Sequence, residues 1–287
     1  MEINNPRGII LMALGFALFA VADTIAKVLL DYYPPLQVVF LRQLGLFFGV
    51  NLIMLYNLKW VGKTHNFSKQ LLRGLTQAGS AVIFLVGLRT IPIADATSIA
   101  FVAPLFVIVF SYFILKEPIG FRRWLAVIIG FSGTLIIIRP GFEIINLGHL
   151  FIIIAALLFA LRQILSRLLA STDDPITTAF FTAYTSVFIF VLFQPWVWTP
   201  ITDKNHIFLF LVYAAFAGTA EFLVIKSLQI AHAVVVSPLQ YTLLIWVTIL
   251  GFIIWGILPD FWTFLGAGVI IATGLYSLHR ERLRKSQ

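Results

Sequence analysis

The chain has 287 residues, of which 60% are hydrophobic and only 11% are charged, and its mean hydropathy is +0.99. Soluble domains carry about a quarter of charged residues, so this composition indicates a membrane protein. The absence of cysteine excludes disulfides, thiolate metal sites and a cysteine nucleophile. The net charge of +8 is distributed as membrane topology requires, so we expect no nucleic-acid partner.

Apolar runs separated by turn and charge signals predict an all-α membrane protein with ten transmembrane helices. A bilayer core of about 30 Å requires about 20 helical residues, which runs of this length supply. Short connections, many with proline or glycine, leave no room for a soluble catalytic domain. The expected helices span residues 8–30, 35–57, 70–89, 93–115, 121–138, 148–169, 175–198, 207–228, 233–256 and 261–279.

The basic residues predict the orientation of these helices. Of twenty lysines and arginines, fourteen fall on the side of the two termini, Arg73 among them, and three fall in the opposite loops. The remaining three, Lys27, Arg42 and Arg162, lie within spans. Because lysine and arginine accumulate on the cytoplasmic side, we expect both termini to be cytoplasmic and the bilayer lipid to be a partner along the whole chain.

The chain also repeats itself after about 140 residues. A shift of 140 aligns Gly8 with Gly148, Lys27 with Arg167 and Pro35 with Pro175, and a shift of 141 aligns Gly133 with Gly274. We therefore predict two five-helix repeats, residues 1–140 and residues 141–287, the second ending in a short basic cytoplasmic tail. Since five is odd, the second repeat enters the membrane inverted, as in many secondary transporters.

Several motifs then identify a family by their order and spacing. They are Asp23-x-x-x-Lys27, Val38-Val39-Phe40-Leu41-Arg42, Ala103-Pro104-Leu105, Lys116-Glu117-Pro118, Arg139-Pro140-Gly141, Ser237-Pro238-Leu239-Gln240-Tyr241-Thr242 and Gly266-Ala267-Gly268. Over essentially its whole length the chain resembles the EamA branch of the drug/metabolite transporter superfamily. Relatives often carry a glutamate before the last helix that matches Glu117, whereas this chain has Asp260 there, which weakens any role for a symmetric pair of loop glutamates.

The resemblance implies transport of small organic metabolites across a bacterial inner membrane. Members with amino-acid, vitamin, nucleoside-like and S-adenosylmethionine-type substrates are known. Within that range we expect a small polar or zwitterionic metabolite, such as an amino acid, its derivative or an S-adenosylmethionine-like compound, moved by alternating access. A vitamin-like, nucleoside-like or aromatic drug-like substrate is the alternative. Protons are a candidate coupling ion, and neither the direction of transport nor the oligomeric state follows from the sequence.

Asp23 is the first candidate for the transport site, because a carboxylate inside an apolar span costs about 3 kcal/mol. It lies about 22 Å along the first helix from Gly8. One interpretation pairs Asp23 with Lys27, four residues later on the same helix face, although Lys27 can also snorkel to the outer headgroups. The other places Asp23 beside a water-filled path. Lys27 recurs as Arg167 while Asp23 is replaced by Gln163 in the second repeat, which favours the functional interpretation.

Arg42 and Glu221 are the next candidates. Arg42 either snorkels or pairs with Asp23 or Asp31, or it clamps a substrate carboxylate or phosphate, which guanidinium binds through two parallel hydrogen bonds. Glu221 has small neighbours that permit close helix approach. It either forms a structural ion pair with Arg162 or binds a substrate amine or a proton.

Other polar, aromatic and proline residues give weaker signals. Pro104 and Pro238 remove backbone hydrogen bonds, which predicts hinges or cavity-lining carbonyls, although proline is also common in membrane helices. Further candidate substrate contacts, each also consistent with ordinary packing, are Gln77, Gln163, Gln240, Tyr241 and Trp246.

The sequence shows no enzymatic or metal-binding pattern. Its five histidines are isolated near helix ends, so we expect no metal site and no cofactor. The chain lacks a P-loop, which argues against direct ATP drive, and it lacks a Gly-x-Ser-x-Gly elbow. A channel or a polytopic membrane enzyme remain the alternatives from other classes. A channel would conduct without saturation, and an enzyme would need a catalytic cluster at one membrane face.

Overall fold

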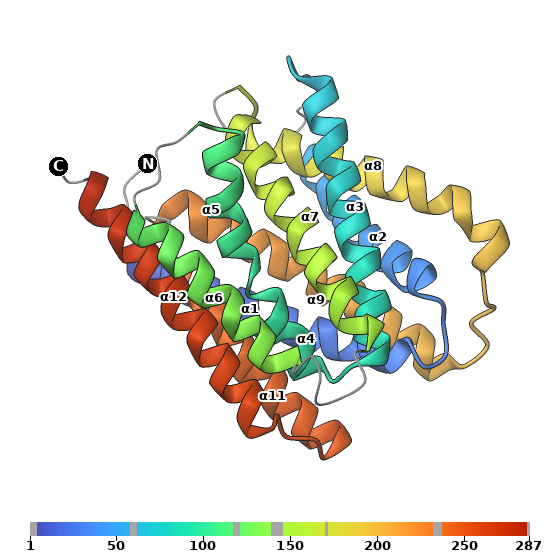
Figure 1. The fold of residues 1–287 in the computed structure, drawn as a ribbon. Helices are drawn as coiled ribbons and strands as arrows, with labels where there is room; N and C mark the ends of the chain where they lie inside the picture. The colour runs from blue at the N-terminus through green and yellow to red at the C-terminus, as the bar shows by residue number, and fades with distance from the viewer. Residues whose placement is uncertain are drawn as a thin grey trace.

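The computed structural model describes residues 5–57, 62–116, 121–138, 146–169, 172–231 and 237–285. This part of the chain forms helices and no β-strand, as the sequence predicts (Figure 1). In chain order the elements are α1 (Asn5–Leu29), α2 (Pro35–Asn57), α3 (Phe67–Thr90), α4 (Ile93–Ala100), α5 (Ala103–Phe113), α6 (Phe121–Ile138), α7 (Leu147–Leu169), α8 (Pro175–Val197), α9 (Lys204–Ile230), η1 (Ser237–Tyr241), α11 (Thr242–Trp255) and α12 (Phe261–Lys285).

Most of these helices can cross a membrane. Seven described stretches are long and apolar enough, namely Pro6–Leu29, Pro35–Tyr56, Phe67–Thr90, Ile93–Phe113, Leu147–Ser166, Ile176–Val197 and Lys204–Val224. Three shorter apolar helices accompany them, Trp124–Ile138, Leu239–Trp255 and Phe261–Tyr276. Large apolar side chains such as Phe121 and Ile253 stay mostly exposed, which only lipid tolerates on this scale. The chain is therefore a multi-pass membrane protein.

The fourth expected helix, residues 93–115, is found as one apolar stretch, Ile93–Phe113, but the prediction of one continuous helix is wrong. α4 ends at Ala100 and α5 begins at Ala103, so the chain breaks at Phe101–Val102, just before Pro104. Pro104 lacks the N–H that would bond to Ala100, which is why the ladder ends there. The region around Pro238 is a 3₁₀ turn, η1, that leads into α11. The rings of Phe101 and Tyr241 meet edge to face at 5.1 Å, so the two interruptions lie together.

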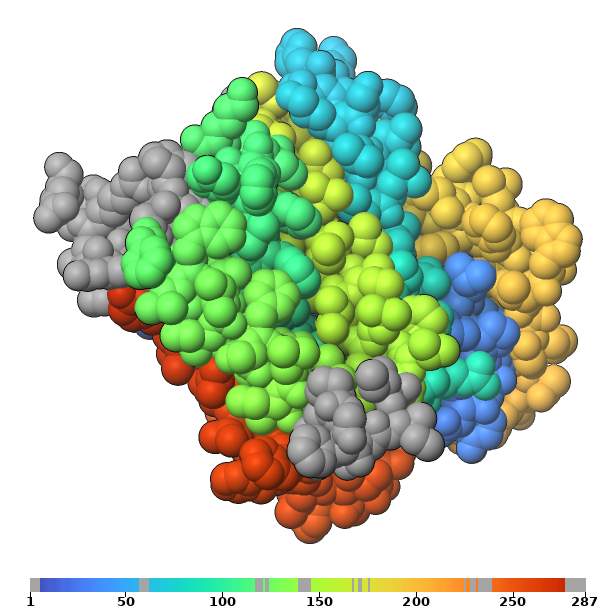
Figure 2. Space-filling view, viewed as in Figure 1, coloured from blue at the N-terminus to red at the C-terminus, as the bar shows by residue number. Residues whose placement is uncertain are grey.

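Helices of the first half pack on helices of the second half in matched pairs. α1 packs on α9 as α3 packs on α7, and α1 packs on α11 as α7 packs on α5. α2 packs on α9 as α8 packs on α3. The pairs α2–α8, α4–α11 and α6–α12 complete the bundle, and α6 runs beside α12 in Figure 1. In the space-filling view α5, α6 and α7 cover one face side by side (Figure 2).

Glycines allow the closest of these approaches. A Cβ added at Gly266 of α12 would lie 2.5 Å from the carbonyl oxygen of Gly133 of α6, closer than a side chain tolerates. At the α2–α9 crossing, a Cβ at Gly45 would collide with the backbone of Ala214. Small residues therefore bring backbones together where lipid gives no hydrophobic drive for helix association.

Two sets of polar contacts close opposite ends of the bundle. Near the start of α3, the Asp173 carboxylate accepts hydrogen bonds from Thr64 and from Gln70 Nε2, the latter at 2.6 Å. Near the start of α2, Tyr33 and His206 share a hydrogen bond of 2.9 Å, and Gln37 bonds to the backbone of Thr199. Because α2 crosses the bundle between these points, one contact lies at each end. We call them the Asp173 contact and the His206 contact.

Candidate functional site

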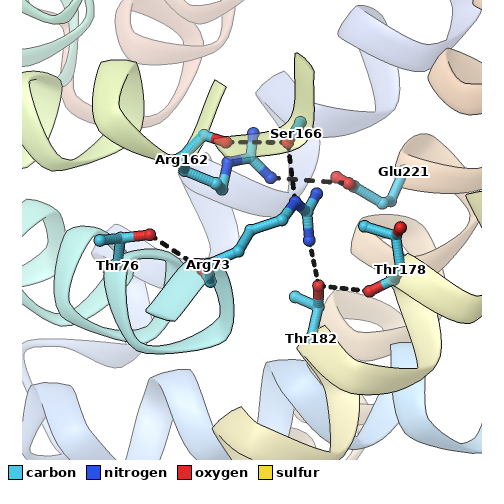
Figure 3. Close-up of polar contacts among 7 residues, drawn as sticks. All are labelled: Arg73, Thr76, Arg162, Ser166, Thr178, Thr182 and Glu221. Atoms are coloured by element: carbon cyan, nitrogen blue, oxygen red, sulfur yellow. Dashed lines mark hydrogen bonds and ion pairs between the residues drawn. The ribbon is translucent and has the colours of Figure 1, made fainter. Parts of the chain in front are cut away.

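Arg73 of α3 reaches across to two neighbouring helices (Figure 3). Its Nε donates to Ser166 Oγ of α7 at 2.7 Å, and its Nη1 donates to Thr182 Oγ1 of α8. Both hydroxyls donate their own proton to a backbone carbonyl four residues earlier, Ser166 to Arg162 and Thr182 to Thr178. Each hydroxyl oxygen can therefore only accept from Arg73, which fixes the guanidinium in one orientation.

Arg162 of α7 lies beside Arg73 and points at Glu221 of α9 (Figure 3). Its Nη1 is 3.9 Å from Glu221 Oε1, and its guanidinium carbon is 4.5 Å from the centre of the Phe159 ring. At 3.9 Å the pair is an ion pair without a close hydrogen bond. The Glu221 side chain keeps 29% of its surface exposed, so its carboxylate stays accessible. The predicted Arg162–Glu221 pair therefore exists, and a substrate role for Glu221 stays a prediction.

Asp23 and Arg42 extend this group through α1 and α2. Arg42 lies 5.9 Å from the Phe19 ring and close enough to Asp23 for an electrostatic interaction. Arg42 also lies close enough to Arg162 of α7 for the two positive charges to repel each other. The side chains of Asp23 and Arg42 are only partly buried. We call Asp23, Arg42, Arg73, Arg162 and Glu221 the central charged cluster.

Two features of the central charged cluster suit an anionic group of a ligand. With both carboxylates ionised, its three arginines leave one excess positive charge. Within the described part of the chain, the Nε atoms of Arg42 and Arg162 are buried and lack a hydrogen-bond partner. A buried donor without a partner costs about 1–3 kcal/mol, so an acceptor brought by a ligand would be bound favourably.

Lys27 does not join the cluster, although it lies one turn from Asp23. Its Nζ donates to the carbonyl oxygens of Leu88 at 2.7 Å and Ile91 at 2.6 Å, at the end of α3. Those carbonyls lack partners within the helix, and the C-terminal end of a helix dipole favours a cation. Neither pairing with Asp23 nor snorkelling to the headgroups therefore describes Lys27; it caps α3. The side chain of Arg167, its counterpart in the repeat, lies outside the described residues.

Two of the predicted glutamines lie beside the central charged cluster. Gln77 is one turn beyond Arg73 on α3, and its Oε1 is buried without a partner among the described residues. Gln163 follows Arg162 and is exposed. It is nine residues, or about two and a half turns, from the exposed Ile154, so it points away from the lipid face of α7.

The remaining predicted residues gather around η1. Tyr241 is buried against Phe101 and Gly274, and Gln240 is partly buried. Trp246 is 41% exposed and lies two turns from the exposed Ile253, on the lipid side of α11. The structure therefore does not bring Trp246 towards the central charged cluster. The Pro238 side chain lies outside the described residues.

A separate cavity of about 380 Å³ opens at the end of the bundle that holds Lys27. It lies between the ends of α1, α3 and α11 and the starts of α4 and α12. Its charged lining residues are Lys27, Arg89, Asp95 and Asp260. Asp95 accepts a hydrogen bond from Thr263 Oγ1 at 2.9 Å, and Asp260 caps α12 through the Thr263 N–H. Lys27, Asp95 and Asp260 of this lining are thus engaged in contacts at helix ends.

Arg73 is the residue that sequence reasoning missed. The sequence pattern places Arg73 only among the basic residues at the cytoplasmic ends of helices. In the structure, α3 begins at Phe67 and carries Arg73 into the bundle. A signal was available, because Gln70, Arg73, Gln77 and Ser80 form a polar stripe with helical spacing on an apolar helix. In the described part of the chain, no three His, Cys, Asp or Glu residues come together as metal ligands would.

Comparison with known proteins gives this geometry a family. The EamA-like transporter family model matches residues 6–139 and again residues 146–278. The S-adenosylmethionine uptake transporter of Rickettsia prowazekii is 26% identical over 282 residues, covering 96% of this chain and 94% of that protein. The riboflavin transporter of Rhizobium johnstonii is 24% identical over 230 residues, covering 78% of this chain and 74% of that protein.

The fold also matches a solved structure. One crystal structure superposes with a TM-score of 0.67, covering 97% of this chain and 98% of that chain at 16% identity, which supports the fold alone. The family matches together cover nearly all of the sequence. The chain belongs to the EamA-like transporter family.

Proposed function

We propose that this protein moves a small zwitterionic metabolite, an S-adenosylmethionine-like compound, across the bacterial inner membrane. The central charged cluster carries the proposal, because it offers both carboxylates and guanidinium groups inside the membrane. S-adenosylmethionine has a carboxylate, an ammonium and a sulfonium, so each of its charges has an opposite charge in the cluster. Similarity to the Rickettsia transporter along nearly the whole chain supports the same assignment.

We infer that transport uses two inverted five-helix repeats, residues 1–140 and residues 141–287. The two family matches, the paired packing of α1–α9 with α3–α7, and the interruptions beside Phe101 and Tyr241 all support this division. Alternating access then consists of opening the Asp173 contact or the His206 contact in turn around a midplane site. Both contacts are formed in this structure.

We further propose that both termini face the cytoplasm. The excess of basic residues on that side persists after Arg73 is moved into the bundle, since thirteen remain against three in the opposite loops. The Asp173 contact then lies at the cytoplasmic end, and the cavity beside Lys27 opens outward. Fusing a reporter active only in the cytoplasm to the C-terminus tests this orientation, and an inactive reporter on a well-inserted protein contradicts it.

Uptake by proteoliposomes tests the substrate. Purified protein is reconstituted, loaded with unlabelled S-adenosylmethionine and given the labelled compound outside. We expect saturable counterflow that unlabelled S-adenosylmethionine abolishes and that methionine or riboflavin reduces less. Counterflow that riboflavin abolishes at lower concentration would favour the vitamin-like alternative, which similarity to the riboflavin transporter supports. Flux that rises linearly with concentration would indicate a channel.

A further inference from the structure

We propose that Arg73, together with Arg162, binds the carboxylate of the substrate and makes the transporter select carboxylate-bearing metabolites. This inference rests on the proposed function and goes beyond it. It assigns the anion site to the α3–α7 side of the central charged cluster, where Figure 3 shows both guanidinium groups beside a single carboxylate, Glu221.

The distribution of charge selects this pair over Arg42. Arg42 has Asp23 as an opposite charge nearby. Arg73 and Arg162 instead repel each other and share their attraction to Glu221. A single carboxylate therefore faces two guanidinium groups in a setting that desolvates them. One further negative charge placed there would balance the group, and the carboxylate of an amino-acid-like substrate supplies one such charge.

The hydrogen bonds of Arg73 leave part of its guanidinium available. Ser166 and Thr182 occupy Nε and Nη1, and within the described part of the chain no bond occupies Nη2. The neighbouring Arg162 has a buried Nε without a partner in the same part of the chain. Both side chains therefore keep N–H groups from which a substrate carboxylate could accept.

Glu221 completes the site for a zwitterion. Its side chain keeps 29% of its surface exposed, and its carboxylate is held by a 3.9 Å ion pair instead of a close hydrogen bond. It can therefore attract the cationic centre of a substrate without first breaking a strong bond. An ammonium lies next to the carboxylate in every α-amino acid, so a substrate bound through Arg73 would bring its ammonium towards Glu221.

A purely structural role is the competing explanation, because Arg73 also ties α3 to α7 and α8. Substrate selectivity separates the two roles. Decarboxylated S-adenosylmethionine keeps the adenosine, the sulfonium and the amine, and it lacks only the carboxylate. Losing an anion site should weaken transport of the parent compound alone, whereas losing a helix tie should affect both compounds equally.

The experiment measures KM for both compounds in proteoliposomes containing wild type, Arg73→Gln or Arg73→Lys. The matched control is Lys69→Gln, which removes an exposed cation from the same helix. We expect Arg73→Gln to raise KM for S-adenosylmethionine by about 30-fold, as a charged hydrogen bond implies, and KM for the decarboxylated compound by less than 3-fold. Arg73→Lys keeps the charge and loses the planar guanidinium. We therefore expect it to raise KM for S-adenosylmethionine by about 10-fold and to leave KM for the decarboxylated compound unchanged.

Each result decides the matter. Equal loss for both compounds, or unchanged KM for S-adenosylmethionine, overturns this inference while the proposed function stands. A wild type that carries neither compound overturns the proposed function, and this inference with it. Should Arg73→Gln fail to fold, as thermal unfolding would show, the same comparison is made with Arg73→Lys and Thr182→Val. An unselective effect in both of these variants also overturns the inference.

Discussion

Lys27 and the Arg73–Arg162 pair are all cations carried into the membrane by apolar helices, yet they meet different surroundings. Two backbone carbonyls at the end of α3 accept from Lys27, and these carbonyls need a donor because the helix ends there. Arg73 and Arg162 share one loosely held carboxylate and keep donor atoms without acceptors. An embedded charge is therefore available to a substrate only where the protein itself leaves it incompletely paired.

Removing the carboxylate that Arg73 and Arg162 share should lower transport more than the other substitutions considered below. We expect Glu221→Gln to lower kcat/KM for S-adenosylmethionine by about 100-fold, because two arginines then face each other without any carboxylate between them. Counterflow in proteoliposomes measures this. Asp31→Asn, at an exposed aspartate of the α1–α2 turn, is the control and should transport normally. A Glu221→Gln variant with parental transport would remove Glu221 from the site.

Asp23 should give the next largest effect. Asp23→Asn leaves Arg42 without its nearby carboxylate, and we expect kcat/KM to fall by about 30-fold. The same variant should also change the dependence of the transport rate on pH if Asp23 carries a coupling proton. If Asp23→Asn transports and titrates like the parent protein, Asp23 belongs to the scaffold.

A substitution at Lys27 should lower stability and leave substrate binding unchanged. We expect Lys27→Gln to lower Tm by about 5 °C, since two hydrogen bonds from a charged donor are lost at the end of α3. KM for S-adenosylmethionine should stay within 2-fold of the parent value. Thermal unfolding and counterflow on one preparation give both numbers. A large rise in KM at unchanged Tm would place Lys27 in the binding site and contradict the distinction.

The smallest effect concerns the Asp173 contact. Burial would raise the pKa of Asp173, but hydrogen bonds from Thr64, Gln70 and Thr172 outweigh it and hold the pKa below its ordinary value. A lowered pKa gives stability that is fully present above the unfolded value of about 3.9 and is lost only as pH falls through the folded value. Wild type should therefore melt about 2 °C above Asp173→Asn from pH 5 to 8. The gap should close below pH 4, and the absence of a gap between pH 5 and 8 would contradict this.

Most of the fold could be predicted from the sequence because lipid imposes long apolar helices. Every expected helix whose start is described begins within three residues of its expected position, for example Pro35 in α2 and Phe261 in α12. What the sequence did not predict in the first half is the interruption at Phe101–Val102 between α4 and α5. Proline indicates a kink, but only the packing of Phe101 on Tyr241 shows that the helix is interrupted there.

The site could be predicted only in part. Asp23, Arg42 and Glu221 stand out because they are charged residues inside apolar runs. Arg73 lies near a helix end, and the sequence does not reveal how far α3 enters the bundle. Lys27 resembles the other embedded cations in sequence, and its carbonyl partners lie more than sixty residues away. Pairing between distant helices, which decides the role of a buried charge, depends on the fold.

Ligand-induced stabilisation tests the central distinction most directly. Purified wild type, Lys27→Gln and Arg162→Gln are melted with and without S-adenosylmethionine at about 100 times its wild-type Kd, where binding adds about 2.7 kcal/mol to wild-type stability. We predict that Lys27→Gln melts early yet keeps the full ligand-induced rise in Tm, and that Arg162→Gln loses most of that rise. A full rise in Arg162→Gln, or its loss in Lys27→Gln, would contradict the account.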